Sequence, residues 1–528
     1  MTPGDHAAAL PRPGAATGYL RRLATTGAAY TAASVVSKLI AVALLPLYTR
    51  YLTTADYGTA EVMFAAVVTA SIVVRLGMIE ALLRFYYKED EDPASIVATS
   101  FAALFWLSSA ASLIALPFAK PISEALLPHP APELARISIG GLWVLTMNEY
   151  LLTLFRLEER ARAFFVTTMI NVLAAIGLTV ILVVGAEEGA RGLLIGSYAS
   201  GAGVVLGLIF VHRRRLSLWV DRPLLRRLMR FGLPTMPAEL SLYALNFVDR
   251  VILARSAGVG AAGLYSLAVK FAQGVNVLVR GFQLAWPPLA YSIHDDDEAR
   301  RAYAAVVTWF AAGCAFVVTG LWLLSRWIVR ALAAPEFFGS YKAIGLVATG
   351  VTLYALYMVL VVILGRTGRT EFNFPAAAAG LFANVALNLA LVPPLGIVGA
   401  GLALVASYLV VLGLMYVFTQ RLFPVPYEWG RLARVVLVSA ALVGGAESLL
   451  PTAGAGGFLL RTVFWFAYPV ALLACGFFTA GERRRMGELR HPGALLRSLR
   501  PPRPASTAVG GGVPEAVEAE LIDEDVRL

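Results

Sequence analysis

Five polar side chains are spaced along an otherwise apolar stretch, AVKFAQGVNVLVRGFQLAWPP, at residues 268–288. They follow one another at intervals of three, three, four and three residues, so a helix would place them all on one stripe. Two cations and three amides on one face suit the wall of a hydrated cavity that holds an anion, because both groups donate to phosphate oxygens. The five residues are Lys270, Gln273, Asn276, Arg280 and Gln283.

The amides have a second interpretation, which is ordinary hydrogen bonding between packed helices, and the sequence does not separate it from cavity lining. The cations differ, because a charge at a helix centre costs about 2.5–3.5 kcal/mol on insertion scales. Lys38, Arg75 and Lys270 lie too deep in apolar segments to reach the membrane interface. We therefore expect each of them to face a cavity or a partner, and Arg280 is intermediate.

Three further charged residues lie nearer to the ends of apolar segments. Arg84 is close enough to a segment end for its side chain to reach the interface. Asp249 and Arg250 lie toward the outer end of another segment, and two interpretations stay open for them. They belong to a transport site, with Asp249 as a candidate for ion coupling, or they neutralise nearby charges. The excess of cations over anions inside these segments indicates a negatively charged substrate.

The composition is that of an integral membrane protein. Of the 528 residues 58% are hydrophobic and 15% are charged, and the mean hydropathy is +0.71, well above the roughly 45–50% apolar content of soluble domains. Apolar stretches of membrane-spanning length recur along the whole chain. We expect an all-α protein of about fourteen spanning helices, at 28–50, 58–83, 95–118, 137–157, 163–185, 191–211, 233–255, 263–291, 302–325, 343–364, 372–392, 396–419, 431–450 and 458–479.

The net charge of +10 does not indicate nucleic-acid binding, because the positive residues fall in alternate loops. About thirty of the 44 Lys and Arg residues lie on the side of the two termini, which predicts that both termini are cytoplasmic. The N-terminal segment lacks the features of a cleaved signal peptide. The densest basic cluster, 212–232, is either a topology determinant or a docking site for anionic lipid or a partner.

A weak internal repeat indicates two similar halves. Arg50 and Gly58 recur as Arg255 and Gly263 at an offset of 205 residues. A duplicated unit of six helices would leave such an offset, and an even number of helices makes the two repeats parallel around a central cavity. The expected parts are an N-terminal segment (1–27), a first bundle (28–212), a basic linker (213–232), a second bundle (233–420), two additional helices (431–479) and a disordered tail (480–528).

The sequence shows no pattern typical of an enzyme. We find no nucleotide-binding loop, paired carboxylate site or His/Cys cluster, so we expect no catalytic residues, no cofactor and no metal. Cys314 and Cys475 lie in apolar stretches and indicate no disulfide framework. Without an ATP site, transport would depend on an ion gradient or on the gradient of the substrate itself.

At this point several motifs resemble the polysaccharide flippase (Wzx-type) branch of the multidrug/oligosaccharidyl-lipid/polysaccharide exporter superfamily. The motifs are LPLYTRYLTTADYG (45–58), RLGMIEALLRFYY (75–87), FGLPTMPAELSLYALNFVDRVILARSAGVGAAGLYSLAVKF (231–271), FQLAWPPLAY (282–291) and NVALNLALVPPLGIVGAGLALVASY (384–408). Arg84 belongs to the second of them, and Asp249 and Arg250 to the third. By this resemblance Arg84 and Arg250 are candidates for substrate binding, and Asp249 is the candidate for ion coupling.

The resemblance implies a flippase of the bacterial inner membrane. It would carry an undecaprenyl-diphosphate-linked oligosaccharide to the outer leaflet by alternating access, for O-antigen, capsule or exopolysaccharide synthesis. The implied partners are the lipid-linked oligosaccharide, membrane lipid, a polysaccharide polymerase and a chain-length regulator. A peptidoglycan lipid II flippase is the main alternative. A multidrug exporter would carry acidic cavity residues, and a membrane glycosyltransferase or polymerase would need a large outward loop.

Overall fold

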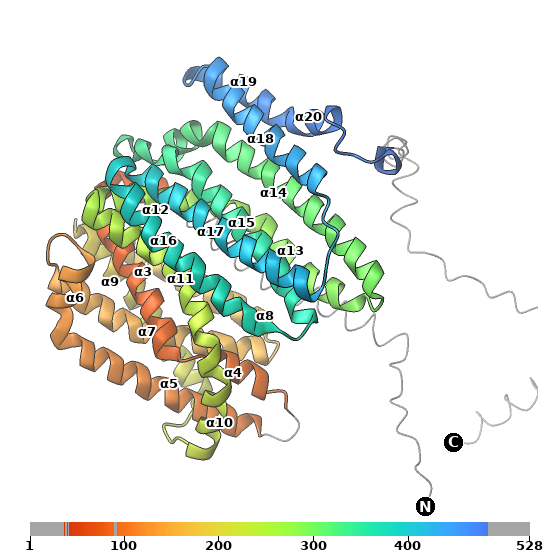
Figure 1. Ribbon diagram of the computed structural model, residues 1–528. Helices are drawn as coiled ribbons and strands as arrows, with labels where there is room; N and C mark the ends of the chain where they lie inside the picture. The colour runs from red at the N-terminus through yellow and green to blue at the C-terminus, as the bar shows by residue number, and fades with distance from the viewer. Residues whose placement is uncertain (1–35, 37–39, 41, 89–91, 484–528) are drawn as a thin grey trace, which may run out of the picture. The chain divides into compact units, whose positions relative to one another are not determined.

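The computed structural model describes residues 36, 40, 42–88 and 92–483, and these residues form helices and no strands (Figure 1). Lys38 and most of the predicted first span lie outside the described residues. By internal contacts the chain divides into two compact units, Met1–Leu472 and Leu473–Leu528. The packing described below belongs to the first unit.

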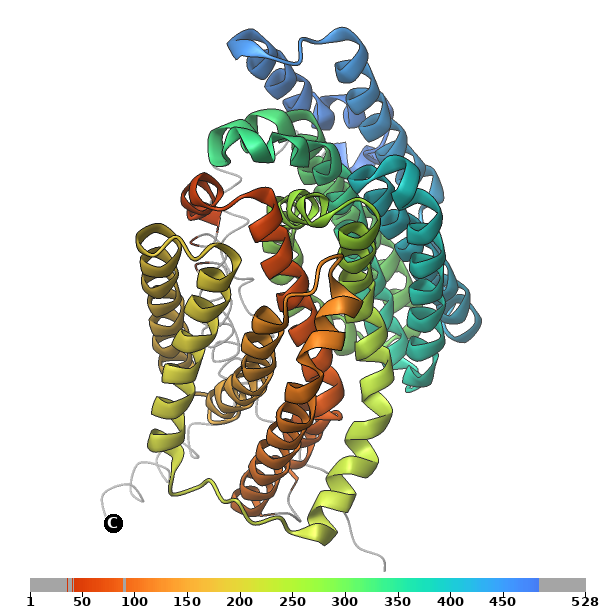
Figure 2. The ribbon, with the colours of Figure 1, turned by 90° about the vertical axis from the view of Figure 1, so that its left-hand side faces the viewer.

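Helix α3 of the first half lies against helices of both halves. This helix packs against α5, α7 and α9 of its own half and also against α11 and α12 of the second half; Figure 2 shows α3 in red beside α11 in yellow-green. The helices are α2 (Leu45–Tyr51), α3 (Thr54–Arg75), α4 (Met78–Phe85), α5 (Pro93–Ala115), α6 (Ala119–Leu126), α7 (Pro132–Leu157), α8 (Ala161–Val180) and α9 (Gly189–His212).

The second half packs mainly through α16 and α17, which lie against α11 and α15, while α14 packs on α15. Helix α3 begins and helix α11 ends at the same end of the bundle. The charges of the loops predict that this end faces away from the cytoplasm, and we call it the predicted outer end. The helices are α11 (Met236–Ser256), α12 (Val259–Ala272), α13 (Val275–Ser292), α14 (Asp296–Leu332), α15 (Tyr341–Arg366), α16 (Asn373–Leu395) and α17 (Ile397–Leu422).

The predicted linker contains an amphipathic helix, α10 (Arg222–Gly232), which packs against α4 and α5. It buries Leu224 and Leu228, while Arg226 and Arg230 are exposed. After the second half, α18 (Trp429–Leu449) and α19 (Gly454–Phe466) pack against α14, and α20 (Tyr468–Ala474) follows.

Three of the predicted spans are broken in the structure, and one of them, 458–479, is divided at Ala467 into α19 and α20. The span predicted at 58–83 divides into α3 and α4 at Leu76 and Gly77, whose φ angles of 48° and 69° are left-handed. The span predicted at 263–291 is also not one helix, since Gln273 and Gly274 separate α12 from α13. Ten helices of the described residues are long and apolar enough to cross a membrane, and the bent pair α19–α20 would add an eleventh.

The predicted count of fourteen is therefore not confirmed. The predicted spans without a counterpart among these helices are 28–50, 233–255 and 263–291. The first lies largely outside the described residues. The second is α11, which carries several charged residues and is less apolar for that reason, and the third is broken.

The two halves meet closely through the glycines that the repeat relates. A Cβ atom on Gly58 would collide with the backbone of Val259 and Gly263, and a Cβ atom on Gly263 would collide with the backbone of Thr54. Only glycine permits this approach of α3 and α12. The contact lies at the predicted outer end, where Glu336 also accepts hydrogen bonds from the backbone N–H and the hydroxyl of Thr54 at 2.9 and 2.8 Å.

Candidate functional site

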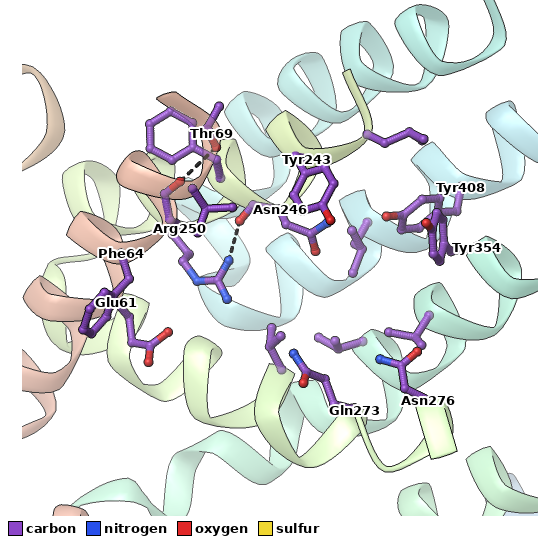
Figure 3. A pocket seen from close by; sticks show the side chains of 18 of the residues that line it. Glu61, Phe64, Thr69, Tyr243, Asn246, Arg250, Gln273, Asn276, Tyr354 and Tyr408 are labelled. Carbon is purple, nitrogen blue, oxygen red and sulfur yellow. Dashed lines mark hydrogen bonds between the residues drawn. The ribbon is translucent and has the colours of Figure 1, made fainter. Parts of the chain in front are cut away.

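A cavity of ≈ 460 Å³ lies between the two halves, where α3, α11, α12, α13, α15 and α17 meet (Figure 3). Its wall mixes apolar side chains with hydroxyls, amides and a few charges. This volume is in the usual range for small-molecule sites. The polar lining residues are Glu61, Thr69, Tyr243, Asn246, Arg250, Gln273, Asn276, Arg280, Gln283, Tyr354 and Tyr408.

Four of the five residues of the predicted stripe line this cavity. Gln273 lies in the break between α12 and α13, and Asn276, Arg280 and Gln283 follow on α13. Figure 3 shows the amides of Gln273 and Asn276 facing the same space as the guanidinium group of Arg250 from α11. The helix break therefore leaves these polar groups convergent on one cavity.

The two arginines of the wall have no acidic partner among the described residues. Arg250 donates from Nε to Oγ of Ser266 at 3.0 Å and from Nη1 to the carbonyl oxygen of Asn246 at 2.6 Å. Both acceptors are neutral, so they orient the guanidinium group without balancing its charge. Arg280 is exposed to the cavity side of α13 and has no ion pair within the described part of the chain. These two cations can neutralise an anion in the cavity.

Lys270, the first residue of the stripe, has a partner in the protein. Its Nζ lies 2.6 Å from Oε1 of Glu61, and it lies over the ring of Tyr57 at 4.8 Å. The ion pair joins α12 to α3, and the side chain of Glu61 is 10% exposed. Glu61 is not among the site residues predicted from the sequence, although a carboxylate inside an apolar span has an insertion cost similar to that of the cations.

Arg75 is likewise paired. It contacts Glu149 of α7 at 2.6 Å and Glu239 of α11 at 3.2 Å, so that it ties α3 to both helices. The excess of buried cations predicted from the sequence was counted without these two glutamates and without Glu61. With Asp249 also counted, four carboxylates equal the four cations in number, so the predicted excess of cations is not found among these residues. What remains is that Arg250 and Arg280 have no ion pair within the described part of the chain.

Asp249 does not line the cavity but is fully buried beside it. Its two carboxylate oxygens accept hydrogen bonds from the hydroxyl of Tyr265 at 3.0 Å and from Nδ2 of Asn388 at 2.6 Å. Asn388 also donates to the carbonyl oxygen of Asn384 at 2.9 Å. We find no ion-pair partner for Asp249 within the described residues, so neutral donors from α12 and α16 surround this carboxylate.

The remaining predicted site residues lie elsewhere. Arg84 is exposed on α4, with its guanidinium group 4.3 Å from the ring centroid of Phe231, and it does not line the cavity. Lys38 falls outside the described residues. Among the described residues, no group of three or more His, Cys, Asp or Glu is placed to hold a metal ion.

Comparisons with known proteins place this fold. No curated protein sequence matches the chain. The family described as "Polysaccharide biosynthesis protein" matches residues 24–294, just over half of the chain.

Several solved structures share the fold at low sequence identity. An inward closed structure of the lipid II flippase MurJ is 14% identical, with a TM-score of 0.67 over 85% of this chain and 97% of that one. An inward-facing multidrug resistance MATE family transporter of the MOP superfamily is 14% identical, with a TM-score of 0.61 over 76% and 95%. A MOP superfamily transporter from Pyrococcus furiosus, described by the reverse polarity of its binding pocket, is 15% identical, with a TM-score of 0.54 over 79% and 95%. The predicted fold class, an all-α multi-pass membrane protein, is confirmed.

Proposed function

Because the chain belongs to the polysaccharide biosynthesis protein family, we propose that it moves an undecaprenyl-diphosphate-linked oligosaccharide across the bacterial inner membrane. The product would be used for a surface polysaccharide such as O-antigen, capsule or exopolysaccharide. The observation that carries this proposal is the cavity between the halves, with Arg250 and Arg280 in its wall. A diphosphate would be the acidic partner that these two arginines do not have among the described residues.

In this proposal the diphosphate lies between α11 and α13. Arg250 and Arg280 donate to its oxygens, and Gln273, Asn276 and Gln283 complete the hydrogen bonds that an anion needs in a partly dehydrated site. The sugars contact the tyrosines of the wall, while the lipid chain stays in the bilayer. Transport by alternating access then requires α3 and α12 to separate at the predicted outer end.

We propose Asp249 as the ion-coupling residue. A buried carboxylate that receives only neutral donors is a suitable group to take up a proton or a sodium ion. Asn384 and Asn388 on α16 supply further oxygens beside it. In this proposal a change in ion occupancy at Asp249 acts on the next residue of α11, Arg250, which would hold the diphosphate.

The proposed location follows from the charges of the loops. We propose that both termini and the basic cluster 212–232 are cytoplasmic. The exposed arginines of α10 support this proposal, since positive residues favour that side. A polysaccharide polymerase and a chain-length regulator are the proposed partners on the product side.

A second candidate function is the transport of lipid II. It is favoured by the likeness to the lipid II flippase MurJ, which extends over 85% of this chain. A lipid II flippase also needs cations for a diphosphate. Expression in a strain depleted of its own lipid II flippase separates the two functions, since rescue of growth supports lipid II and failure to rescue supports the oligosaccharide.

The proposal is tested by charge changes at Arg280, which has no hydrogen bond or ion pair to lose within the described residues. Arg280→Glu places an anion against an anion and should abolish surface polysaccharide in a flippase-null strain. Arg280→Lys keeps the charge but loses the bidentate geometry, and it should do less damage. Lys120→Glu is the matched control, because Lys120 is 71% exposed on α6 and lies outside the cavity. Normal export by an Arg280→Glu protein of normal membrane abundance would falsify the proposal.

A further inference from the structure

A second cavity, of ≈ 190 Å³, lies near the C-terminal end of α14, away from the cavity between the halves. It is bounded by the end of α14, the short 3₁₀ helix Pro335–Ser340, the start of α15 and the loop between α18 and α19. The two cavities share no lining residue. The second cavity is lined by Arg326, Arg330, Phe338, Tyr341 and Thr452.

The guanidinium group of Arg326 is only partly satisfied by the protein. Its Nη2 donates to Oε2 of Glu447 at 3.0 Å, and its Cζ lies 5.1 Å from the ring centroid of Tyr341. Its Nη1 is buried and has no hydrogen-bond partner within the described residues. A buried N–H donor of a charged group that stays unpaired is costly. The cavity therefore holds a charged donor for which the surrounding side chains provide no acceptor.

The carboxylate of Glu447, which accepts from Arg326, is already shared. Glu447 also accepts from Nη1 of Arg461 at 2.6 Å, and the Arg461 side chain is 0% exposed. The other donors of Arg461 bind backbone carbonyls at the end of α18 and just after it, such as those of Ala446 and Pro451, each at 3.1 Å. Arg330 adds a third guanidinium group, and it has no ion pair in the part of the chain that the structure describes. Positive charge thus exceeds negative charge around the cavity.

The position of the cavity along α14 indicates what kind of anion is near. The 37 residues of α14 extend for about 55 Å at 1.5 Å per residue, well beyond a hydrocarbon core of about 30 Å. Arg326 and Arg330 are one turn apart near the end of this helix. Between them Trp327 donates its indole N–H to the carbonyl oxygen of Gly454 at 3.2 Å, and tryptophan is enriched at membrane interfaces. At the membrane interface the anions that a bilayer supplies are lipid phosphates.

We propose that this second cavity binds the phosphate group of an anionic phospholipid headgroup, with Arg326 and Arg330 as its donors and the hydroxyl of Thr452 beside them. The bound headgroup would sit between α14 and the loop from α18 to α19, and would hold the C-terminal helices against the second half. This inference does not depend on the transported substrate, because it concerns a different cavity and a resident lipid.

The test uses the purified full-length protein and measures lipid binding by native mass spectrometry. Phosphatidylglycerol is titrated against phosphatidylcholine of the same acyl chains, for the wild type, for Arg330→Gln and for a control, Lys120→Gln. Arg330 is the residue to change, since its substitution leaves the Arg326–Glu447 pair intact. The control substitution Lys120→Gln removes one positive charge as well, but at an exposed position on α6.

We expect the wild type to bind phosphatidylglycerol at least tenfold more tightly than phosphatidylcholine, and Arg330→Gln to lose about tenfold of that affinity. Lys120→Gln should behave as the wild type. Equal binding of the two lipids, or an unchanged preference in Arg330→Gln, overturns the proposal and leaves the arginines as packing residues. A third arm adds inorganic phosphate alone. If millimolar phosphate displaces phosphatidylglycerol, the ligand is soluble phosphate and the lipid assignment is overturned.

Discussion

The ion pair between Lys270 and Glu61 joins the two halves, and its strength can be measured by a double-mutant cycle. At the Nζ–Oε1 distance of 2.6 Å the attraction is about 6 kcal/mol for an effective dielectric constant of about 20. Desolvation offsets much of it, and removing one partner of a buried pair costs about 3–5 kcal/mol. Because the Lys270 side chain is 32% exposed, solvent screening lowers this further. We expect a coupling free energy of about 2 kcal/mol.

The cycle compares Lys270→Gln, Glu61→Gln and the double variant with the wild type, by reversible unfolding in mixed detergent and dodecyl sulfate micelles. Each single variant leaves one charge without its partner and should be destabilised, whereas the double variant should recover much of the loss. The control cycle uses the exposed pair Arg191–Glu133, with atoms 2.9 Å apart and side chains 47% and 63% exposed. Its coupling should be about 0.5 kcal/mol or less.

A coupling of about 0.5 kcal/mol or less for Lys270 and Glu61 would refute this reasoning, because the buried pair would then behave like the exposed control. So would single variants as stable as the wild type. In either case the packing of α3 against α12, which includes the contact of Gly58 with Gly263, would hold the two helices together without a measurable contribution from this ion pair.

Three further predictions concern packing, coupling and topology. Gly58→Ala should lower the unfolding temperature, because its Cβ meets the carbonyl of Val259, whereas Gly207→Ala, where nothing lies within 4 Å, should not; equal effects would contradict the close contact of α3 and α12. Asp249→Asn should remove the dependence of export on an ion gradient while the protein stays in the membrane, and unchanged gradient dependence would exclude Asp249 as the coupling residue. A cysteine introduced within 212–232 should not react with an impermeant reagent added outside the cell, and labelling from outside would show that the predicted orientation is wrong.

The sequence predicts the helices well where apolar character alone decides them. The spans expected at 137–157 and 163–185 correspond to α7 and to the continuous helical segment Ala161–Gly185. The break between α3 and α4 was not predicted, because it depends on tertiary packing. Gly77 has a left-handed φ of 69° and lies directly against the backbone of Gly232. The periodicity of apolar residues in the sequence does not indicate such a contact.

The candidate site was predicted in part. The stripe that runs from α12 to α13 was found because its three- and four-residue spacing is visible in the sequence. The ion pairs were missed, because Glu61 and Lys270 meet only when α3 packs against α12, and Arg75 meets Glu239 only when it packs against α11. A signal was nevertheless present. The insertion cost that singled out the cations applies to the carboxylates in the same apolar spans.

The central claim is that the cavity between the halves binds a lipid-linked diphosphate, and equilibrium binding of undecaprenyl diphosphate to the purified protein tests it most directly. Undecaprenol, which has the same chain without the diphosphate, is the reference ligand, and Arg250→Gln/Arg280→Gln is the variant. The account predicts that the wild type prefers the diphosphate and that the variant loses at least about tenfold of that affinity while still binding undecaprenol. Equal affinity of the wild type for both lipids, or an unchanged preference in the double variant, would contradict it.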